Sequence, residues 1–163
     1  MAAYTKKLIF VLIFCAGIVL GFLACGALIQ KEQPRAFQAI NASRAPAPVG
    51  PYSQAVQYGD LIFTSGQIGI SPANGTLADS TGNQTIQAME NLQAVLGEAG
   101  LGFDDVIQTR IYLTDMDDFS TVNSIYGRYF SGNYPARSTV EVSALPKGAK
   151  VEIEMIAKKA PGK

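Results

Sequence analysis

The sequence predicts an α+β domain in which two helices cover one face of a β-sheet. Short β-rich runs surround two segments whose apolar residues recur at the three- to four-residue spacing of a helix. Runs and segments follow one another in the order β-β-α-β-α-β-β, and the last two runs are apolar on one side only. A sheet of this kind needs helices to cover its apolar face. The 163 residues allow one such domain and an appendage.

The first elements are expected to be strands. Residues 55–58 and 61–65 have strand composition and flank Gly59-Asp60, a pair that favours a tight turn. Residues 67–70 continue this hairpin or begin a third strand. Asn74-Gly75 then marks a second turn.

Two segments carry the spacing of amphipathic helices. Residues 85–99 form the first, which Gly100 ends, and residues 115–130 form the second, with an acidic start that suits a helix N-terminus. The β-rich residues 106–113 lie between them. The two apolar stripes are Ile86, Met89, Leu92, Val95, Leu96 and Ala99, and Phe119, Val122, Ile125, Tyr126 and Tyr129.

Residues 137–142 and 150–158 are expected to form a final hairpin around Leu145-Pro146-Lys147-Gly148. If the apolar faces of both strands meet the helices, their polar residues share the far face of the sheet. The residues placed there are Arg137, Thr139, Glu141, Glu152 and Glu154. Such a face is either solvated or part of an interface.

Composition excludes several kinds of active site. The chain has no histidine, so it cannot build a Ser-His-Asp triad or a His-ligated zinc site. Both cysteines, Cys15 and Cys25, lie in the apolar N-terminal run, so the domain has no thiol, disulfide or thiolate metal site. From Ala36 onward nine basic and twelve acidic residues give a formal net charge of −3, which disfavours binding to a phosphate backbone.

The N-terminal run indicates membrane targeting. Residues 8–29 contain no charge, amide or hydroxyl, and about 20 apolar residues suffice to cross a bilayer. Residues 1–29 are therefore expected to be a signal peptide or membrane anchor, followed by a linker over residues 30–49. Three alternatives stay open: an uncleaved anchor, a cleaved signal, or a lipoprotein signal with lipidation at Cys25.

The targeting segment predicts the location of the protein. We expect it to be exported, on the periplasmic side and tethered to the inner membrane, with cytoplasmic location the weaker alternative.

Several strings resemble the RidA/YjgF family of reactive-intermediate deaminases. They are GPYSQAVQYGDLIFTSGQ at residues 50–67, VNSIY at residues 122–126, YPARSTVEV at residues 134–142, the following Leu145-Pro146, and KVEIE at residues 150–154. Together they span about residues 40–160 in the family's order and spacing. The resemblance makes residues 50–160 a RidA-like domain.

The resemblance implies a chorismate-mutase-like (YjgF-type) α+β subunit. Three subunits would form a barrel-containing homotrimer, with active sites in the clefts between them. The implied reaction is hydrolysis of enamines and imines, such as 2-aminoacrylate, 2-iminobutanoate and 2-iminopropanoate, to 2-keto acids and ammonia. No metal or organic cofactor is implied.

The positions of this sequence that match the family's motifs imply which residues form the site. Arg137 would bind the substrate carboxylate, because a guanidinium can donate two parallel hydrogen bonds to it. Glu152 would hold the hydrolytic water, and Tyr52 would be the second catalytic side chain. Ser65-Gly66 and Asn123 would contact the substrate.

Two positions depart from well-known members of the family. Thr139, also expected to contact substrate, replaces a cysteine, so thiol-dependent behaviour should not transfer. Gly69 replaces a proline, a change expected to loosen the loop beside the site.

Two other functions compete with the deaminase. One is an exported module that binds a small carboxylate, such as a 2-keto acid, without turnover. The other, ranked last, is an endoribonuclease or translation inhibitor, because the acidic domain lacks histidine and a basic patch.

Overall fold

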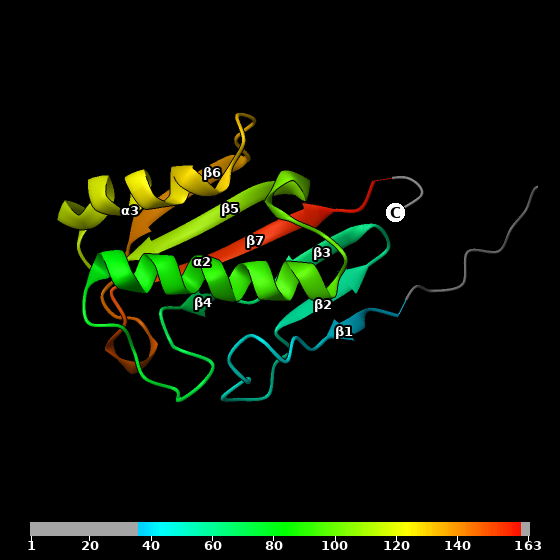
Figure 1. The fold of residues 1–163 in the computed structure, drawn as a ribbon, viewed down its shortest axis with the longest axis horizontal. Coiled ribbons are helices and arrows are strands. Elements are labelled where there is room, and N and C mark those ends of the chain that lie inside the picture. Colours follow the sequence, from blue (N-terminus) through cyan, green and yellow to red (C-terminus); the bar gives the residue numbers. More distant parts are fainter. Residues whose placement is uncertain (1–35, 161–163) are drawn as a thin grey trace, which may run out of the picture. The chain divides into compact units, whose positions relative to one another are not determined.

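The computed structural model describes residues 36–160, which form an α+β domain with one sheet. The strands are β1 (Gln38–Ile40), β2 (Ala55–Tyr58), β3 (Leu61–Thr64), β4 (Gln67–Ile68), β5 (Val106–Leu113), β6 (Ala136–Glu141) and β7 (Val151–Lys158). Their order is β1-β2-β3-β7-β5-β6, with β4 also paired to β7. Both long helices lie on one face of the sheet (Figure 1). The predicted layer arrangement is confirmed.

The first helix is longer than the sequence predicts. Helix α2 (Thr81–Glu98) begins four residues early, because the Ser80 hydroxyl accepts a hydrogen bond from the Asn83 amide at 3.2 Å and caps its first turn. The second expected helix is broken into three pieces: η2 (Met116–Asp118), α3 (Phe119–Tyr126) and η3 (Gly127–Tyr129). Two further short 3₁₀ turns are η1 (Phe103–Asp105) and η4 (Pro146–Gly148).

The core lies between α2, α3 and the sheet. Most of its fully buried large side chains come from the apolar stripe of α2 and from alternate residues of the central strands, as the periodicity predicts, but Ile86 of the predicted stripe is 37% exposed. They include Ile62, Met89, Leu92, Leu96, Ile111, Leu113, Ile153 and Met155.

The expected final hairpin is wrong. Strand β7 lies in the middle of the sheet between β3 and β5, whereas β6 is an edge strand that pairs in parallel with β5. Alternation of apolar residues reveals which face of a strand is buried, but not which strand will be its neighbour.

The expected sharing of one face is also wrong. Arg137 pairs with Thr109, whose buried hydroxyl accepts a hydrogen bond from Tyr126 of α3, so Arg137 lies on the helix side. Glu152 pairs with Tyr112, between positions whose side chains are buried under the helices, so Glu152 lies on the opposite side.

Part of the predicted linker belongs to the domain. Strand β1 pairs with β2, and Ile40 is buried in the core. The Gln54 side chain donates to the carbonyl oxygens of Ala42 and Pro46 at 3.1 and 2.8 Å, which holds this segment in place. The polar, proline-containing composition of the range conceals these few anchoring residues.

Within the described part of the chain, no helix has the length and apolar character needed to cross a membrane. The predicted signal or anchor at residues 1–29, with its apolar helix and Cys25, lies outside residues 36–160.

Candidate active site

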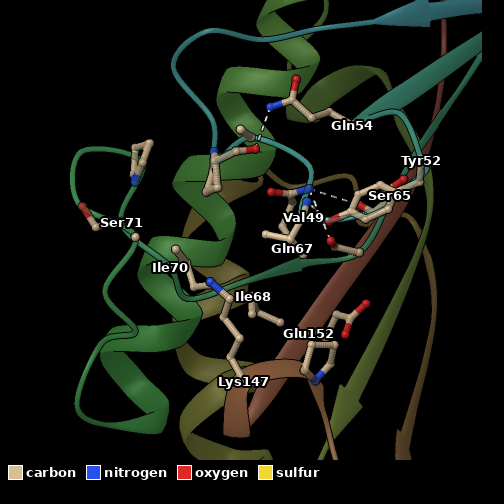
Figure 2. Close-up of a pocket in the computed structure, with 16 residues that line it drawn as sticks. Val49, Tyr52, Gln54, Ser65, Gln67, Ile68, Ile70, Ser71, Lys147 and Glu152 are labelled. Carbon is tan, nitrogen blue, oxygen red and sulfur yellow. Dashed lines mark hydrogen bonds between the residues drawn. The ribbon is translucent and has the colours of Figure 1, made fainter.

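Four of the expected site residues line one cavity of about 540 Å³, here called the glutamate cavity. Glu152 of β7, Tyr52, Ser65 and Gly66 form one part of its wall (Figure 2). The remaining wall is largely apolar and is built by Pro46, Ala47, Val49, Gln54, Gln67, Ile68, Ile70, Ser71, Pro72, Gly75, Pro146 and Lys147. A carboxylate in a mostly apolar cavity is a common arrangement for a general acid or base.

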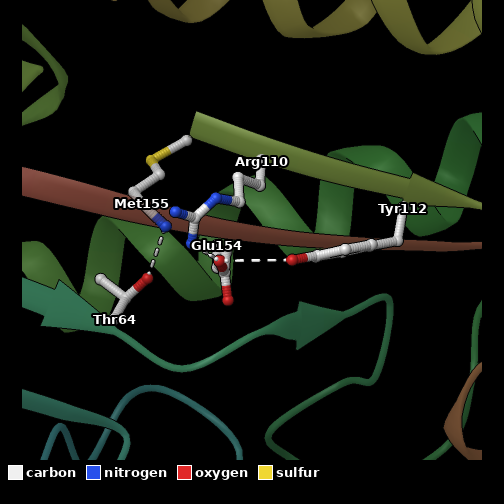
Figure 3. A network of polar contacts seen from close by, with 5 residues as sticks. All are labelled: Thr64, Arg110, Tyr112, Glu154 and Met155. Carbon is white, nitrogen blue, oxygen red and sulfur yellow. Dashed lines mark hydrogen bonds and ion pairs between the residues drawn. The ribbon is translucent and has the colours of Figure 1, made fainter. Parts of the chain in front are cut away.

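The carboxyl group of Glu152 has a raised pKa. Burial is the main cause, because it penalises the charged form, and the nearby negative charge of Glu154 raises the pKa further. Glu154 itself is occupied on the same face: it accepts hydrogen bonds from Arg110 at 2.7 Å and from Tyr112 at 3.4 Å (Figure 3). Glu152 can therefore gain and lose a proton closer to neutral pH than an ordinary glutamate.

The other two polar residues of this wall are held by the backbone around them. The Ser65 hydroxyl donates to the Ser53 carbonyl oxygen at 2.6 Å. The phenol oxygen of Tyr52, a residue that is 48% exposed, accepts a hydrogen bond from the Val49 amide at 3.3 Å. Both hydroxyl groups retain hydrogen-bonding capacity toward a ligand.

Arg137 and Asn123 line a second pocket of about 510 Å³, here called the arginine pocket. Tyr126, Gly127, Tyr134 and Pro135 complete its wall. It shares no lining residue with the glutamate cavity. Arg137 is the second residue of the edge strand β6, and Asn123 is exposed on α3.

Two aromatic rings hold the guanidinium of Arg137. Its central carbon lies 5.0 Å from the ring centre of Tyr126 and 5.7 Å from that of Phe119. Tyr126 is fixed in turn, because its hydroxyl donates to the buried Thr109 hydroxyl at 3.0 Å. Contacts with ring faces orient a guanidinium without using its N–H donors, so these donors can bind a carboxylate.

Thr139 lies two residues beyond Arg137 on the same side of β6. Its hydroxyl oxygen is buried and has no hydrogen-bond partner, the only such side-chain atom that residues 36–160 contain. A buried hydroxyl without a partner is unfavourable, so a ligand or another chain that bonds to it would stabilise this edge.

The loop beside the glutamate cavity packs closely on α2 at Gly69. A side chain at Gly69 would collide with Gln84 of α2, with its Cβ 2.6 Å from the Cβ of Gln84, so the loop packs directly on the helix. Asn91 also donates hydrogen bonds to the carbonyl oxygens of Ile68 and Ile70 at 3.2 and 2.9 Å. These contacts hold the loop against the helix at this point.

The role of the aromatic pair is not evident from the sequence. The apolar pattern predicts only that Phe119 and Tyr126 lie on the buried stripe of a helix, but they stand seven residues apart, a spacing that places two rings on one face of α3. In residues 36–160 no three Cys, His, Asp or Glu side chains converge to hold a metal ion.

Comparison with known proteins identifies relatives over the described domain. The family model described as Endoribonuclease L-PSP matches residues 42–159. Protein DfrA of Myxococcus xanthus is 53% identical over 125 residues, 74% of this chain and 94% of the relative. The mouse protein named 2-iminobutanoate/2-iminopropanoate deaminase is 47% identical over 123 residues, 75% of this chain and 91% of the relative.

Solved structures agree with the fold. The Rid-family protein YyfA of Yersinia pestis has a TM-score of 0.74 at 48% identity, covering 76% of this chain and 100% of that one. Escherichia coli TdcF, solved with bound serine, has a TM-score of 0.73 at 40% identity, covering 76% of this chain and 99% of that one.

The same relatives correct the expected location. The matched domain makes up 94% and 91% of the two relatives described above, which leaves too little of either for a counterpart of the run at residues 1–29. Export to the periplasmic side with tethering to the inner membrane is contradicted by this similarity. The match of the family model over residues 42–159, together with these identities, shows that the chain belongs to the RidA/YjgF family.

Proposed function

We propose that this protein hydrolyses small enamines and imines derived from amino acids to 2-keto acids and ammonia. The observation that carries the proposal is the pair of half-sites: a half-buried carboxyl group in one cavity and an arginine with free donors in another. Relatives named 2-iminobutanoate/2-iminopropanoate deaminase at 47% and 44% identity support this reaction. Suitable substrates are 2-aminoacrylate, 2-iminobutanoate and 2-iminopropanoate.

The two half-sites would be joined by association of subunits. In one chain Arg137 and Glu152 lie on opposite sides of the sheet, so a small substrate cannot reach both. Arg137 and the unpartnered Thr139 hydroxyl lie on the edge strand β6, where a second chain could place its glutamate cavity. A homotrimer with sites between subunits would satisfy this requirement three times by symmetry.

Each residue then has a chemical role. Arg137 of one subunit binds the substrate carboxylate, with Asn123 and Thr139 beside it. Glu152 of the neighbour accepts a proton from water as the water oxygen bonds to the imine carbon.

The same proton then completes the reaction. The imine reacts in its N-protonated form, which an enamine reaches by taking a proton from solvent at its β-carbon, so the C=N electron pair moves to nitrogen as water adds. Glu152 then returns its proton to the amino group of the tetrahedral intermediate. The C–N bond breaks with its electron pair leaving on ammonia, and the hydroxyl proton of the intermediate passes to the Glu152 carboxylate as the ketone forms. A carboxyl group with a raised pKa suits both transfers. Tyr52, Ser65 and Gly66 would line the space in which the imine lies.

A coupled assay with the full-length chain tests this function. A dehydratase generates 2-aminoacrylate or 2-iminobutanoate from an amino acid, and ammonia and keto acid are measured with and without the protein. We expect faster release than in the control without protein, and sedimentation should give the mass of a trimer. Saturable binding of 2-keto acid without acceleration would contradict the deaminase and indicate a binding module.

Replacing Phe119 by leucine should weaken substrate binding. The change removes one ring from the guanidinium of Arg137, and a cation–π contact of this kind contributes about 1 kcal/mol. We expect KM to rise about fivefold while kcat changes little. Phe119→Tyr keeps the ring and serves as the matched control. An unchanged KM in the leucine variant, measured by steady-state kinetics, would show that the ring does not orient the arginine.

A further inference from the structure

The junction between β3 and β4 contains one extra residue opposite β7. Phe63 pairs with Ile156, and Gln67 pairs with Ile153. The segment from β3 to β4 therefore advances four residues while β7 opposite it advances three. An insertion of this kind is a β-bulge, which bends a strand and redirects its side chains. The bulge falls at Ser65-Gly66, beside the glutamate cavity.

The bulge is fixed by hydrogen bonds on both sides. The Met155 amide of β7 donates to the side-chain oxygen of Thr64 at 2.8 Å (Figure 3). On the other side the Ser65 amide donates to the Gln54 carbonyl oxygen at 2.9 Å. These bonds hold the backbone of Gly66 in one position against β7.

Gly66 faces the carboxyl group of Glu152 directly. A Cβ atom at Gly66 would lie 2.6 Å from Cδ and 2.9 Å from Cγ of Glu152, and closer still to its Oε1 atom. No real side chain can occupy that space while Glu152 keeps its place. The carboxyl group therefore rests on bare backbone, with a hydrogen atom where any other residue would carry carbon.

We propose that Gly66, presented by the bulge, is the positioning residue of Glu152: its missing side chain creates the only space in which the carboxyl group reaches the reacting water. The assignment differs from a contact between the Ser65-Gly66 backbone and the substrate. It deepens the proposed function and, in its kinetic part, rests on it.

The replacement Gly66→Ala separates positioning from folding. The obstructing atoms belong to the far end of a flexible side chain, so Glu152 can swing away without disturbing the backbone. We expect a thermal midpoint close to that of the unaltered protein and a kcat lower by about a hundredfold, the cost of moving a reacting group by about 1 Å. Gly102→Ala is the matched control, because a Cβ at Gly102 meets nothing within 4 Å.

A double-mutant cycle distinguishes positioning from a general disturbance of the cavity. In the Glu152→Gln background there is no catalytic carboxylate to displace, so Gly66→Ala should lower the residual rate less than about threefold. An equal loss in both backgrounds, or no loss in either, would overturn the assignment.

A titration that does not depend on turnover completes the test. Carbon NMR of the Glu152 carboxyl group should show its raised pKa falling toward the ordinary value in Gly66→Ala, because the displaced group becomes more exposed. The titratable residues around it, Glu154 and Tyr112 beside it and Lys147 in the same cavity wall, are unchanged by the replacement. If the unaltered protein fails to hydrolyse imines, the proposed function fails, and this titration alone decides the positioning: an unchanged pKa would overturn it.

Discussion

Replacing Arg137 by lysine should remove most of the deaminase activity although the positive charge remains. The guanidinium, held between Phe119 and Tyr126, can donate two parallel hydrogen bonds to a planar carboxylate and so fix its orientation. An ammonium group is a point charge that leaves the substrate free to rotate. Misplacement of the imine carbon by about 1 Å is expected to lower kcat/KM about a hundredfold.

Binding and rate together test the role of this arginine. Affinity for a 2-keto acid, measured by calorimetry, should fall with the rate in Arg137→Lys. Arg128→Lys, at an exposed position of η3, is the control and should change neither. Turnover near that of the unaltered protein in Arg137→Lys, with the assembly intact, would show that Arg137 serves the interface rather than the substrate.

Replacing Glu152 by glutamine should lower kcat by about 10²–10⁴, the usual contribution of a general acid or base. The amide has the same shape and can still bond to water, but it cannot take the proton. The affinity for a 2-keto acid should therefore stay unchanged. Glu98→Gln, at the exposed end of α2, is the control. An unchanged kcat would remove Glu152 from the reaction.

The pH dependence gives Glu152→Gln a second signature. The basic form of Glu152 exists above its raised pKa, so the rate of the unaltered protein should rise as pH increases through that value, and the variant should lack this limb. The free energy of unfolding should instead fall as pH rises through the same pKa. Burial favours the neutral carboxyl, so ionisation above the folded-state pKa destabilises the native state, and Glu152→Gln should melt at a higher temperature at pH 7.

The sequence predicts most elements because their signals are local. Apolar spacing locates α2 and β5, and the turn pairs separate β2 from β3. The position of β6 depends on long-range pairing with β5, which no local pattern specifies. The sequence therefore predicts a hairpin of β6 and β7, whereas β6 pairs in parallel with β5 at the edge of the sheet. Strand β1 cannot be predicted from the sequence for a similar reason: three residues paired with β2 leave little trace in composition.

For the candidate site as well, the residue types can be predicted from the sequence, whereas their arrangement depends on long-range packing. Family resemblance predicts Arg137 and Glu152 as site residues, but only the sheet topology places them on opposite faces. Gly66 is visible in the sequence as a glycine after a strand, whereas its contact with Glu152 requires the register of two strands. The rings around Arg137 likewise depend on how α3 packs over β6.

Co-expression of two inactive chains tests the shared site most directly. Arg137→Lys and Glu152→Gln are produced together with different tags, and assemblies that carry both tags are isolated. If each site of a trimer takes its arginine from one subunit and its glutamate from the next, every assembly that contains both variants has one site of three in which both residues are intact. We therefore expect about a third of the activity of the unaltered protein in mixed assemblies. Activity no higher than the mean of the two variants would contradict a site shared between subunits.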